Sequence, residues 1–145
     1  MTDNGHRVVR LEFCSAFDMV DFVQIVSDHM GRIAGLDEDA LHWVSVAVRE
    51  SVVNAIKHGN RSDPTKHVFV EFASTSSEIS VRIRDQGDGF DPDNVADPLS
   101  PENMLKSSGR GIFLMRSFMD DLTLERVPEG GMEVRMLKKA QKPGA

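Results

Sequence analysis

Residues 67–85 alternate between apolar and polar side chains over two consecutive stretches, which limits the chain to folds that contain a half-buried sheet. HVFVEFAST and SEISVRIRD share this pattern, are rich in β-branched residues, and meet at the polar link STSS. A period of two places the apolar side chains of a strand on one face of its sheet. We therefore expect an antiparallel hairpin with one face buried.

Two amphipathic segments precede the hairpin. Between residues 16 and 34, apolar side chains recur at three- and four-residue spacings, and Gly35 ends the pattern. A second segment begins at Asp37, where acidic residues favour the positive end of a helix dipole. This second helix is expected to run to about His58, where a Gly-Asn pair ends it.

Further strands are expected at residues 7–13, 122–127 and 132–139, the last two joined by the turn PEGG. Residues 111–121 have a helical pattern. Residues 86–108 are rich in Gly, Asp, Pro, Asn and Ser and have no sustained period. Connections of that length inside compact domains are usually functional lids or disordered segments.

Composition narrows the possible classes of protein. The 145 residues, 40% apolar and 28% charged, suit one compact domain over residues 1–145. No apolar run approaches the roughly 18 residues of a membrane span, the first ten residues lack a signal-peptide core, and the single Cys14 cannot form an internal disulfide. A cytoplasmic location is expected. The net charge of −6 gives no general attraction for nucleic acid.

The stretch ESVVNAIKHGN places polar residues inside an otherwise apolar helical pattern. At about 100° per residue, Glu50, Asn54 and Lys57 gather opposite the side chains expected to face the core. In most helices a solvated face with an incidental (i, i+4) pair explains such residues. Here Val46 and Val53 flank them, which makes a solvent-exposed polar face a less suitable explanation. A polar face turned toward a ligand is the alternative.

Two glycine-containing segments follow. In RDQGDGFDP, Asp85 stands at the end of a strand, where its carboxylate can accept a fixed hydrogen bond, and glycines let the backbone approach a flat ligand. Alone, this segment is better explained as a Gly/Asp turn. In SSGRGIFLM, glycines stand where a helix begins, which suits a phosphate chain or an ordinary glycine-rich cap equally well.

Together, the ordered set E-x-x-x-N-A-x-K-H-G, D-x-G-x-G-F and G-x-G-x-F-L-M resembles the N, G1 and G2 boxes of the GHKL ATPases, the superfamily of gyrase and histidine kinase ATP-binding domains. Nearly the whole chain is similar to the small bacterial anti-sigma factor serine/threonine kinases, above all in SGRGIFLMRSFMDDL and EGGMEVRMLKK. The resemblance implies the Bergerat ATP-binding fold, an α/β (α+β) two-layer sandwich with a mixed, mostly antiparallel sheet and helices on one face.

The resemblance also implies a role for each motif residue. Asn54 would hold Mg²⁺ against the phosphates of ATP, and Glu50 would be the general base. Lys57 would contact phosphates or simply finish the helix, and for His58 we prefer the second reading. Residues 91–108 would form the ATP lid.

For the base of the nucleotide, the resemblance implies that Asp85 accepts a hydrogen bond from the adenine amino group, while Gly87 and Gly89 let the base and ribose pack against the backbone. Met132 stands where the family often has Thr, so either the lost hydroxyl weakens nucleotide binding by about 1 kcal/mol or the pocket has repacked around the Met side chain. The residues that would wrap the phosphates are Gly109, Arg110 and Gly111.

The function that the resemblance implies is an ATP- and Mg²⁺-dependent serine protein kinase that phosphorylates an anti-sigma factor antagonist and also sequesters a sigma factor. A homodimer is expected, with no direct contact to nucleic acid or membrane. Two alternatives stay open. One is a nucleotide-binding module that sequesters a partner with little or no kinase activity. The other is an ATP-binding regulator in two-component signalling, although a phosphoacceptor helix is missing from the sequence.

Overall fold

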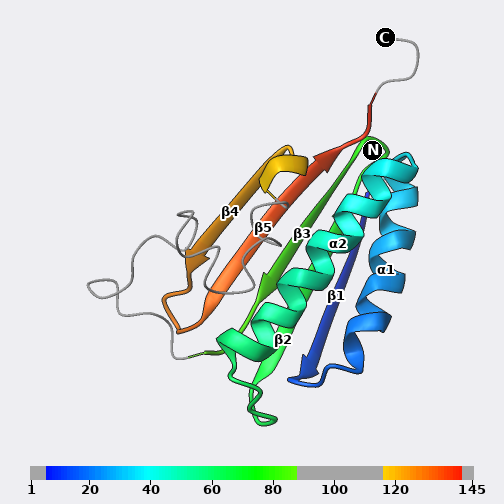
Figure 1. Cartoon of the computed structure of the whole chain (residues 1–145). Coiled ribbons are helices and arrows are strands. Elements are labelled where there is room, and N and C mark those ends of the chain that lie inside the picture. The colour runs from blue at the N-terminus through cyan, green and yellow to red at the C-terminus, as the bar shows by residue number, and fades with distance from the viewer. Residues whose placement is uncertain (1–5, 88–115, 142–145) are drawn as a thin grey trace.

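The computed structural model describes residues 6–87 and 116–141, which form a two-layer α+β sandwich (Figure 1). One layer is a five-stranded sheet in the order β1-β2-β3-β5-β4, and every strand pair in it is antiparallel. The predicted fold class is confirmed. The elements are β1 (Arg7–Cys14), α1 (Met19–Ile33), α2 (Glu38–Asn54), the π-helix η1 (Ala55–Gly59), β2 (His67–Ser74), β3 (Glu78–Arg84), β4 (Asp121–Arg126) and β5 (Met132–Lys139).

The second predicted helix is present, but its last turn differs from an α-helix. α2 ends at Asn54 and continues into η1, where the amide of Asn60 donates to the carbonyl of Ala55 over 2.8 Å. Such a wider turn contains one residue more than an α-helical turn and is often found at functional sites. The helix begins as predicted, because the Asp37 carboxylate accepts from the amide of Ala40 over 2.8 Å and caps it.

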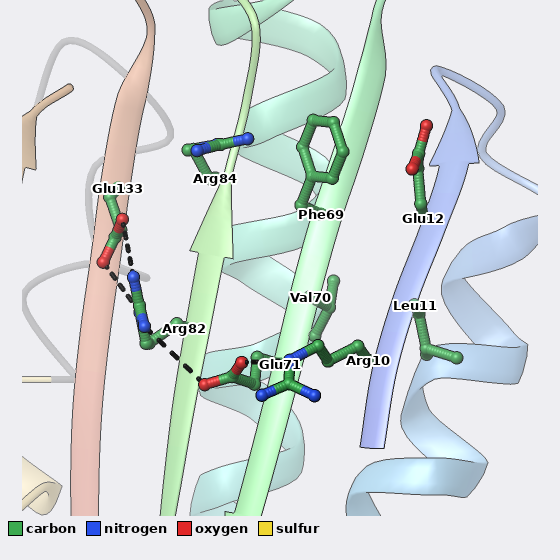
Figure 2. A pocket seen from close by; sticks show the side chains of 9 residues that line it. All are labelled: Arg10, Leu11, Glu12, Phe69, Val70, Glu71, Arg82, Arg84 and Glu133. Carbon is green, nitrogen blue, oxygen red and sulfur yellow. Dashed lines mark hydrogen bonds and ion pairs between the residues drawn. The ribbon is translucent and has the colours of Figure 1, made fainter. Parts of the chain in front are cut away.

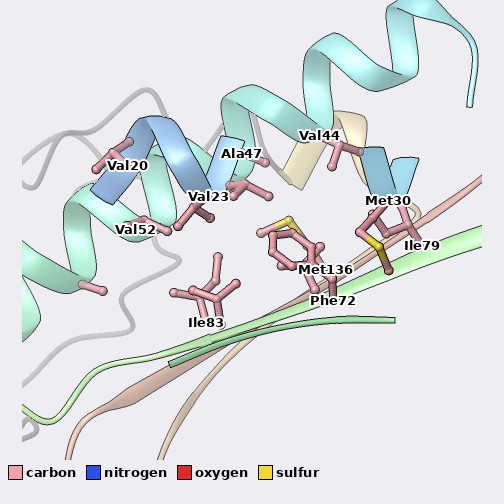
Figure 3. Packing of buried hydrophobic residues seen from close by; sticks show 14 of the residues in the cluster. Val20, Val23, Met30, Val44, Ala47, Val52, Phe72, Ile79, Ile83 and Met136 are labelled. Carbon is pink, nitrogen blue, oxygen red and sulfur yellow. The ribbon is translucent and has the colours of Figure 1, made fainter. Parts of the chain in front are cut away.

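Both long helices cover the same face of the sheet and bury its apolar side chains (Figure 3). The alternation in β2 and β3 places every second side chain inward, and Phe72 at the centre is fully buried. The side chains of α2 predicted to face the core do so. Leu41, Val44, Val48, Val52, Ala55 and Ile56 are all buried.

Residues 116–118 are helical, in agreement with part of the predicted 111–121 helix, and residues 111–115 lie outside the described residues. The strands begin and end within one residue of their predicted positions. Across residues 6–87 and 116–141, no helix combines the length and the apolar composition that crossing a bilayer requires.

The face of the sheet turned away from α1 and α2, called the open face below, carries charged side chains in alternating sign (Figure 2). Arg10 pairs with Glu71 at 2.7 Å, and Arg82 pairs with Glu71 at 3.7 Å and with Glu133 at 3.0 Å. A pocket of about 410 Å³ lies on this face. Because Arg10 and Arg82 already pair with Glu71 and Glu133, we read it as a cross-strand ion-pair surface.

Glu133 lies on β5, between Arg82 and Arg135, and is 8% exposed. Burial opposes its ionisation, but hydrogen bonds and charge from Arg82 and Arg135 outweigh burial and lower the pKa of Glu133. A carboxylate whose pKa is lowered by folding stabilises the fold above its unfolded pKa, and this stabilisation is lost as the pH falls through the folded value.

We expect Glu133→Gln to lower the free energy of unfolding by about 1 kcal/mol at neutral pH, because the arginines lose a charged partner. The difference from wild type should shrink as the pH falls below 4.5, the unfolded value. Urea unfolding at several pH values measures it. Glu125→Gln is the control, since Glu125 is the exposed neighbour of Glu133 in the β4–β5 register. Equal losses in both variants would contradict a stabilising contribution from the pairs of Glu133 with Arg82 and Arg135.

Candidate functional site

Asp85 directly follows β3 and is held by main-chain groups. Its amide donates to the carbonyl of Met132 over 3.1 Å, which extends the β3–β5 ladder by one residue. Its Oδ1 accepts from the amides of Gly87 at 2.9 Å and Met132 at 3.1 Å. Two donors on one oxygen fix the orientation of the carboxylate, which is 5% exposed.

Three glycines from separate segments pack against this carboxylate. A Cβ on Gly59 would collide with Oδ2 of Asp85, and a Cβ on Gly131 would collide with the Asp85 carbonyl. A Cβ on Gly87 would collide with the carbonyl of Gly59. Gly131 also has a φ of +94°, a backbone conformation that residues with a Cβ atom rarely adopt. The absence of Cβ atoms therefore lets η1, the end of β3 and the β4–β5 turn meet at Asp85.

The electrostatic state of Asp85 follows from this packing. Burial raises the pKa of Asp85, while the hydrogen bonds from Gly87 and Met132 act in the opposite direction without cancelling the effect of burial. A buried carboxylate of this kind gains from a further hydrogen-bond donor. Oδ1 already holds both amides, so Oδ2, beside Gly59, is the oxygen suited to accept from a ligand.

The polar residues of the second helix lie on the elements that lead to Asp85. Glu50 and Asn54 are half-buried in α2, one helical turn apart. Lys57 and His58 are exposed in η1. The structure thus joins the Glu50–Asn54 helix to Asp85 through Gly59.

Four predicted site residues and the predicted lid fall outside the part of the chain that the structure describes. They are Gly89, Gly109, Arg110, Gly111 and residues 91–108. Their assigned roles stay predictions.

Asn60, predicted only to help end the helix, is the residue whose part in the site the sequence did not reveal. It is completely buried. Its Nδ2 donates to Ser15 Oγ at 2.9 Å and to the His67 carbonyl at 3.0 Å, and its Oδ1 accepts from the Gln86 amide at 2.7 Å. One amide side chain thus ties the end of η1 to the β1–α1 loop, to β2 and to the residue after Asp85. The sequence signal is only an Asn after a Gly, which is common at exposed helix ends.

The hydrogen bonds between Met132 and Asp85 involve the main chain of Met132. Its amide and carbonyl make the two hydrogen bonds described above, which any non-proline residue could make. The replacement of Thr by Met at this position therefore leaves the support of Asp85 intact.

Residues 17–138 match the family described as histidine kinase-like ATPase domain. The chain belongs to this family. The GHKL resemblance is thereby confirmed, and a domain of this ATPase class implies that ATP is bound.

Curated relatives narrow the group within this ATPase family. A protein of Oceanobacillus iheyensis named "Anti-sigma F factor" is 36% identical over 72% of this chain and 73% of its own length. A Clostridium perfringens protein of the same name is 33% identical over 90% of this chain and 95% of its own length. The Bacillus licheniformis "Serine-protein kinase RsbW" is 28% identical over 83% of this chain and 78% of its own length.

Asn60→Ala is expected to lower the free energy of unfolding by about 3 kcal/mol, because it leaves several buried partners without a hydrogen bond. Chemical denaturation measures this loss. Gln86→Ala is the graded control, since the exposed Gln86 side chain accepts one hydrogen bond, from the His67 amide at 2.7 Å, and its loss should cost about 1 kcal/mol. A loss of stability for Asn60→Ala no larger than that for Gln86→Ala would refute the stabilising role of the buried Asn60 hydrogen bonds.

Asp85→Asn is expected to leave the nucleotide-free protein at least as stable as wild type at neutral pH, since an amide oxygen still accepts from Gly87 and Met132 without a buried charge. Folding raises the pKa of Asp85, so wild-type stability should fall as the pH rises from 3.8 through the folded value. The variant should lack this fall. Unfolding measured between about pH 4 and 8 tests the difference.

Asp63→Asn is the matched control for that series. Hydrogen bonds from the Thr65 side chain and amide lower the pKa of Asp63, so its contribution to stability has the opposite sign and is lost toward acid pH. If stability still falls toward neutral pH in Asp85→Asn, the cause is the titration of a group other than Asp85.

Proposed function

We propose that this chain is an ATP-dependent serine protein kinase that phosphorylates an anti-sigma factor antagonist and also sequesters a sigma factor. The observation that carries the proposal is the buried, doubly held Asp85 carboxylate joined through Gly59 to the helix of Glu50 and Asn54. The relatives named as anti-sigma F factors and as a serine-protein kinase supply the class of partner. The proposal includes Mg²⁺, a homodimer and a cytoplasmic location.

Asp85 would select the base. Oδ2 would accept a hydrogen bond from the adenine amino group, and guanine, with a carbonyl at that position, would meet an acceptor instead. The absence of Cβ atoms at Gly59, Gly87 and Gly131 lets these main-chain segments pack closely around the carboxylate that would meet the base. Gly87 and Gly89 would let the base and ribose pack against the backbone.

Asn54 would hold the phosphate end through Mg²⁺. A hard cation that keeps most of its waters needs few protein ligands, so one amide oxygen with phosphate oxygens suffices. The exposed Lys57, with Gly109, Arg110 and Gly111, would contribute to binding the phosphates.

Glu50 would act as the general base. Its carboxylate would take the proton from the serine hydroxyl of the antagonist as that oxygen attacks the terminal phosphorus of ATP, with ADP as the leaving group. Glu50 is half-buried one turn before Asn54, so the base and the residue assigned to Mg²⁺ face the same side of α2. The added phosphate would release the antagonist by changing the charge of its interface.

A sequestering module without kinase activity is the main rival. Met132, in place of a family Thr, is the sequence feature that favours it. The main-chain contacts of Met132 with Asp85 reduce the weight of that feature, and Glu50 has no obvious task in a protein that only binds.

Isothermal calorimetry of Mg·ATP binding tests the site. Asp85→Asn should weaken ATP binding by about tenfold or more, since it presents a donor to the adenine amino group. Asn54→Ala should weaken binding chiefly by removing its dependence on Mg²⁺. GTP should bind wild type about tenfold more weakly than ATP. Wild-type protein that is folded but binds no adenine nucleotide would exclude the kinase.

Glu50→Gln is the control that separates binding from chemistry. It should bind Mg·ATP about as well as wild type, yet transfer phosphate to an antagonist at least about 100-fold more slowly. Wild-type binding with no transfer to any candidate antagonist would favour the sequestering module.

A further inference from the structure

Among the described strands, β1 forms one edge of the sheet and pairs with β2 alone. The amide of Ser15 donates to the Lys66 carbonyl over 3.1 Å, one step beyond the β1–β2 register. Because hydrogen-bonded pairs alternate along an antiparallel ladder, the odd-numbered residues of β1 bond to β2, and the even-numbered residues direct their amides and carbonyls outward. The edge therefore offers main-chain donors and acceptors to a further strand.

The sequence of this edge, RVVRLEFC, is complementary to itself when one copy is reversed. With Leu11 opposite the Leu11 of a second copy, Arg10 stands opposite Glu12 and Glu12 opposite Arg10. The outward-directed even residues then face one another, as the hydrogen bonds of an antiparallel ladder require. Opposite charges at directly paired positions stabilise such a ladder. One register thus satisfies the main chain and the charges together.

Arg10 and Glu12 are exposed, and each has capacity for a further partner. Arg10 donates to Glu71 through Nε, which leaves the other N–H groups of its guanidinium for a second carboxylate. Glu12 contacts His67 Nδ1 through Oε2 at 2.7 Å, and a carboxylate has a second oxygen that accepts. The contacts within the chain are therefore compatible with pairing to a second copy.

The helix beside this edge has two different sides. Figures 1 and 2 both show α1 next to β1 at this end of the sheet. One side of α1 meets α2, where Gln24 Nε2 donates to Ser45 Oγ over 3.1 Å and Gly31 packs closely on Leu41. The contacts with α2 thus fix which side of α1 is turned away from α2.

The side of α1 turned away from α2 carries an apolar stripe. At about 100° per residue, Met19, Phe22, Val26 and Ile33 gather on that side. The Phe22 side chain lies largely in solvent, with the residue 47% exposed. An apolar stripe along one side of a helix suits packing against another helix. The chain therefore presents an apolar helix side next to a free strand edge.

The centre of the stripe lies at the level of the centre of the strand register. Leu11 precedes the end of β1, at Cys14, by about 10 Å of strand. Val26 follows the start of α1, at Met19, by about 10 Å of helix. Both distances are measured from the end of the sandwich where the chain turns from β1 into α1 (Figure 1). A single two-fold axis can therefore pass close to both Leu11 and Val26.

We propose that a second copy of this chain docks along this edge, with β1 pairing antiparallel to its counterpart about Leu11 and the two apolar stripes in contact. The inference rests on the homodimer included in the proposed function and supplies its interface. A two-fold contact of this kind repeats every favourable pair. It also covers a strand edge that would otherwise invite aggregation. Face-to-face contact through the open face is the competing arrangement.

Charge reversal in the full chain, followed by sedimentation velocity over a concentration series, tests the register. Arg10→Glu places two carboxylates opposite each other at two symmetric points, so dimerisation should weaken at least about tenfold. Adding Glu12→Arg reverses both charges together and should restore the dimer to within about threefold of wild type. Arg84→Glu is the matched control, since it makes the same change of charge on the open face but on β3, and should leave the dimer intact.

Cys14, the single cysteine, provides a second test. In the proposed register Val8 stands opposite Cys14 of the second copy, with Cα atoms about 5.5 Å apart, a separation that suits a disulfide. Within one chain the two positions are about 20 Å apart along the strand and cannot be bridged. Mild oxidation should therefore link Val8→Cys into covalent dimers. Wild type and His6→Cys, which reports a register shifted by two residues, should stay without a crosslink.

Substitutions on α1 test the helix contact. Phe22→Ser removes a ring from the stripe at two symmetric points and should weaken dimerisation about tenfold. Ile25 is the matched control, because it is still more exposed, at 66%, but lies off the stripe. Ile25→Ser should therefore weaken dimerisation less than Phe22→Ser, and the reverse order would contradict contact between the stripes.

The outcomes separate this interface from the rest of the proposed function. A wild-type dimer that Arg84→Glu disrupts as strongly as Arg10→Glu, or that Val8→Cys does not crosslink, overturns the interface while the homodimer and the kinase stand. Wild type that is monomeric at every concentration overturns the interface and the homodimer together. If Arg10→Glu does not fold, the Val8→Cys crosslink decides. Calorimetry of Mg·ATP tests the nucleotide site independently of all these results.

Discussion

The hydrogen bonds from two main-chain amides to one oxygen of Asp85 are the constraint on which the site depends. They come from Gly87, just beyond β3, and from Met132, which begins β5, so the carboxylate is fixed only when these two strands are in register. Burial makes this charge costly in the absence of a ligand. In the proposed function, a hydrogen bond from a nucleotide base to Asp85 would offset this cost.

The two faces of the sheet contribute to the fold through different interactions. The helix side is apolar and excludes water, which stabilises the fold through burial. The open face is a set of ion pairs across four strands, with Glu71 and Glu133 each shared between two arginines. Shared carboxylates fix the side chains of neighbouring strands in register, and this includes the β3–β5 pair that supports Asp85.

Local patterns in the sequence were enough to predict the helices, the strands and the position of Asp85, because periodicity, caps and strand ends depend on neighbouring residues. They could not reveal the role of Asn60. An Asn after a helix is an ordinary feature, and its importance here comes from its contact with Gln86, far along the chain. The strand order, in which β5 lies between β3 and β4, was also not determined by local patterns.

The π-helix η1 lets two parts of the same helical segment meet different packing requirements. In an unbroken α-helix, the rotation set by one part would also fix the other. The core fixes the rotation of α2, since Val48 and Val52 must face the sheet. Gly59 and Asn60 must instead meet Asp85 and Gln86. One additional residue in the turn changes the phase of the helix between these two points. The packing of the core and the surroundings of Asp85 can therefore vary independently, so sequence change in one need not be matched in the other.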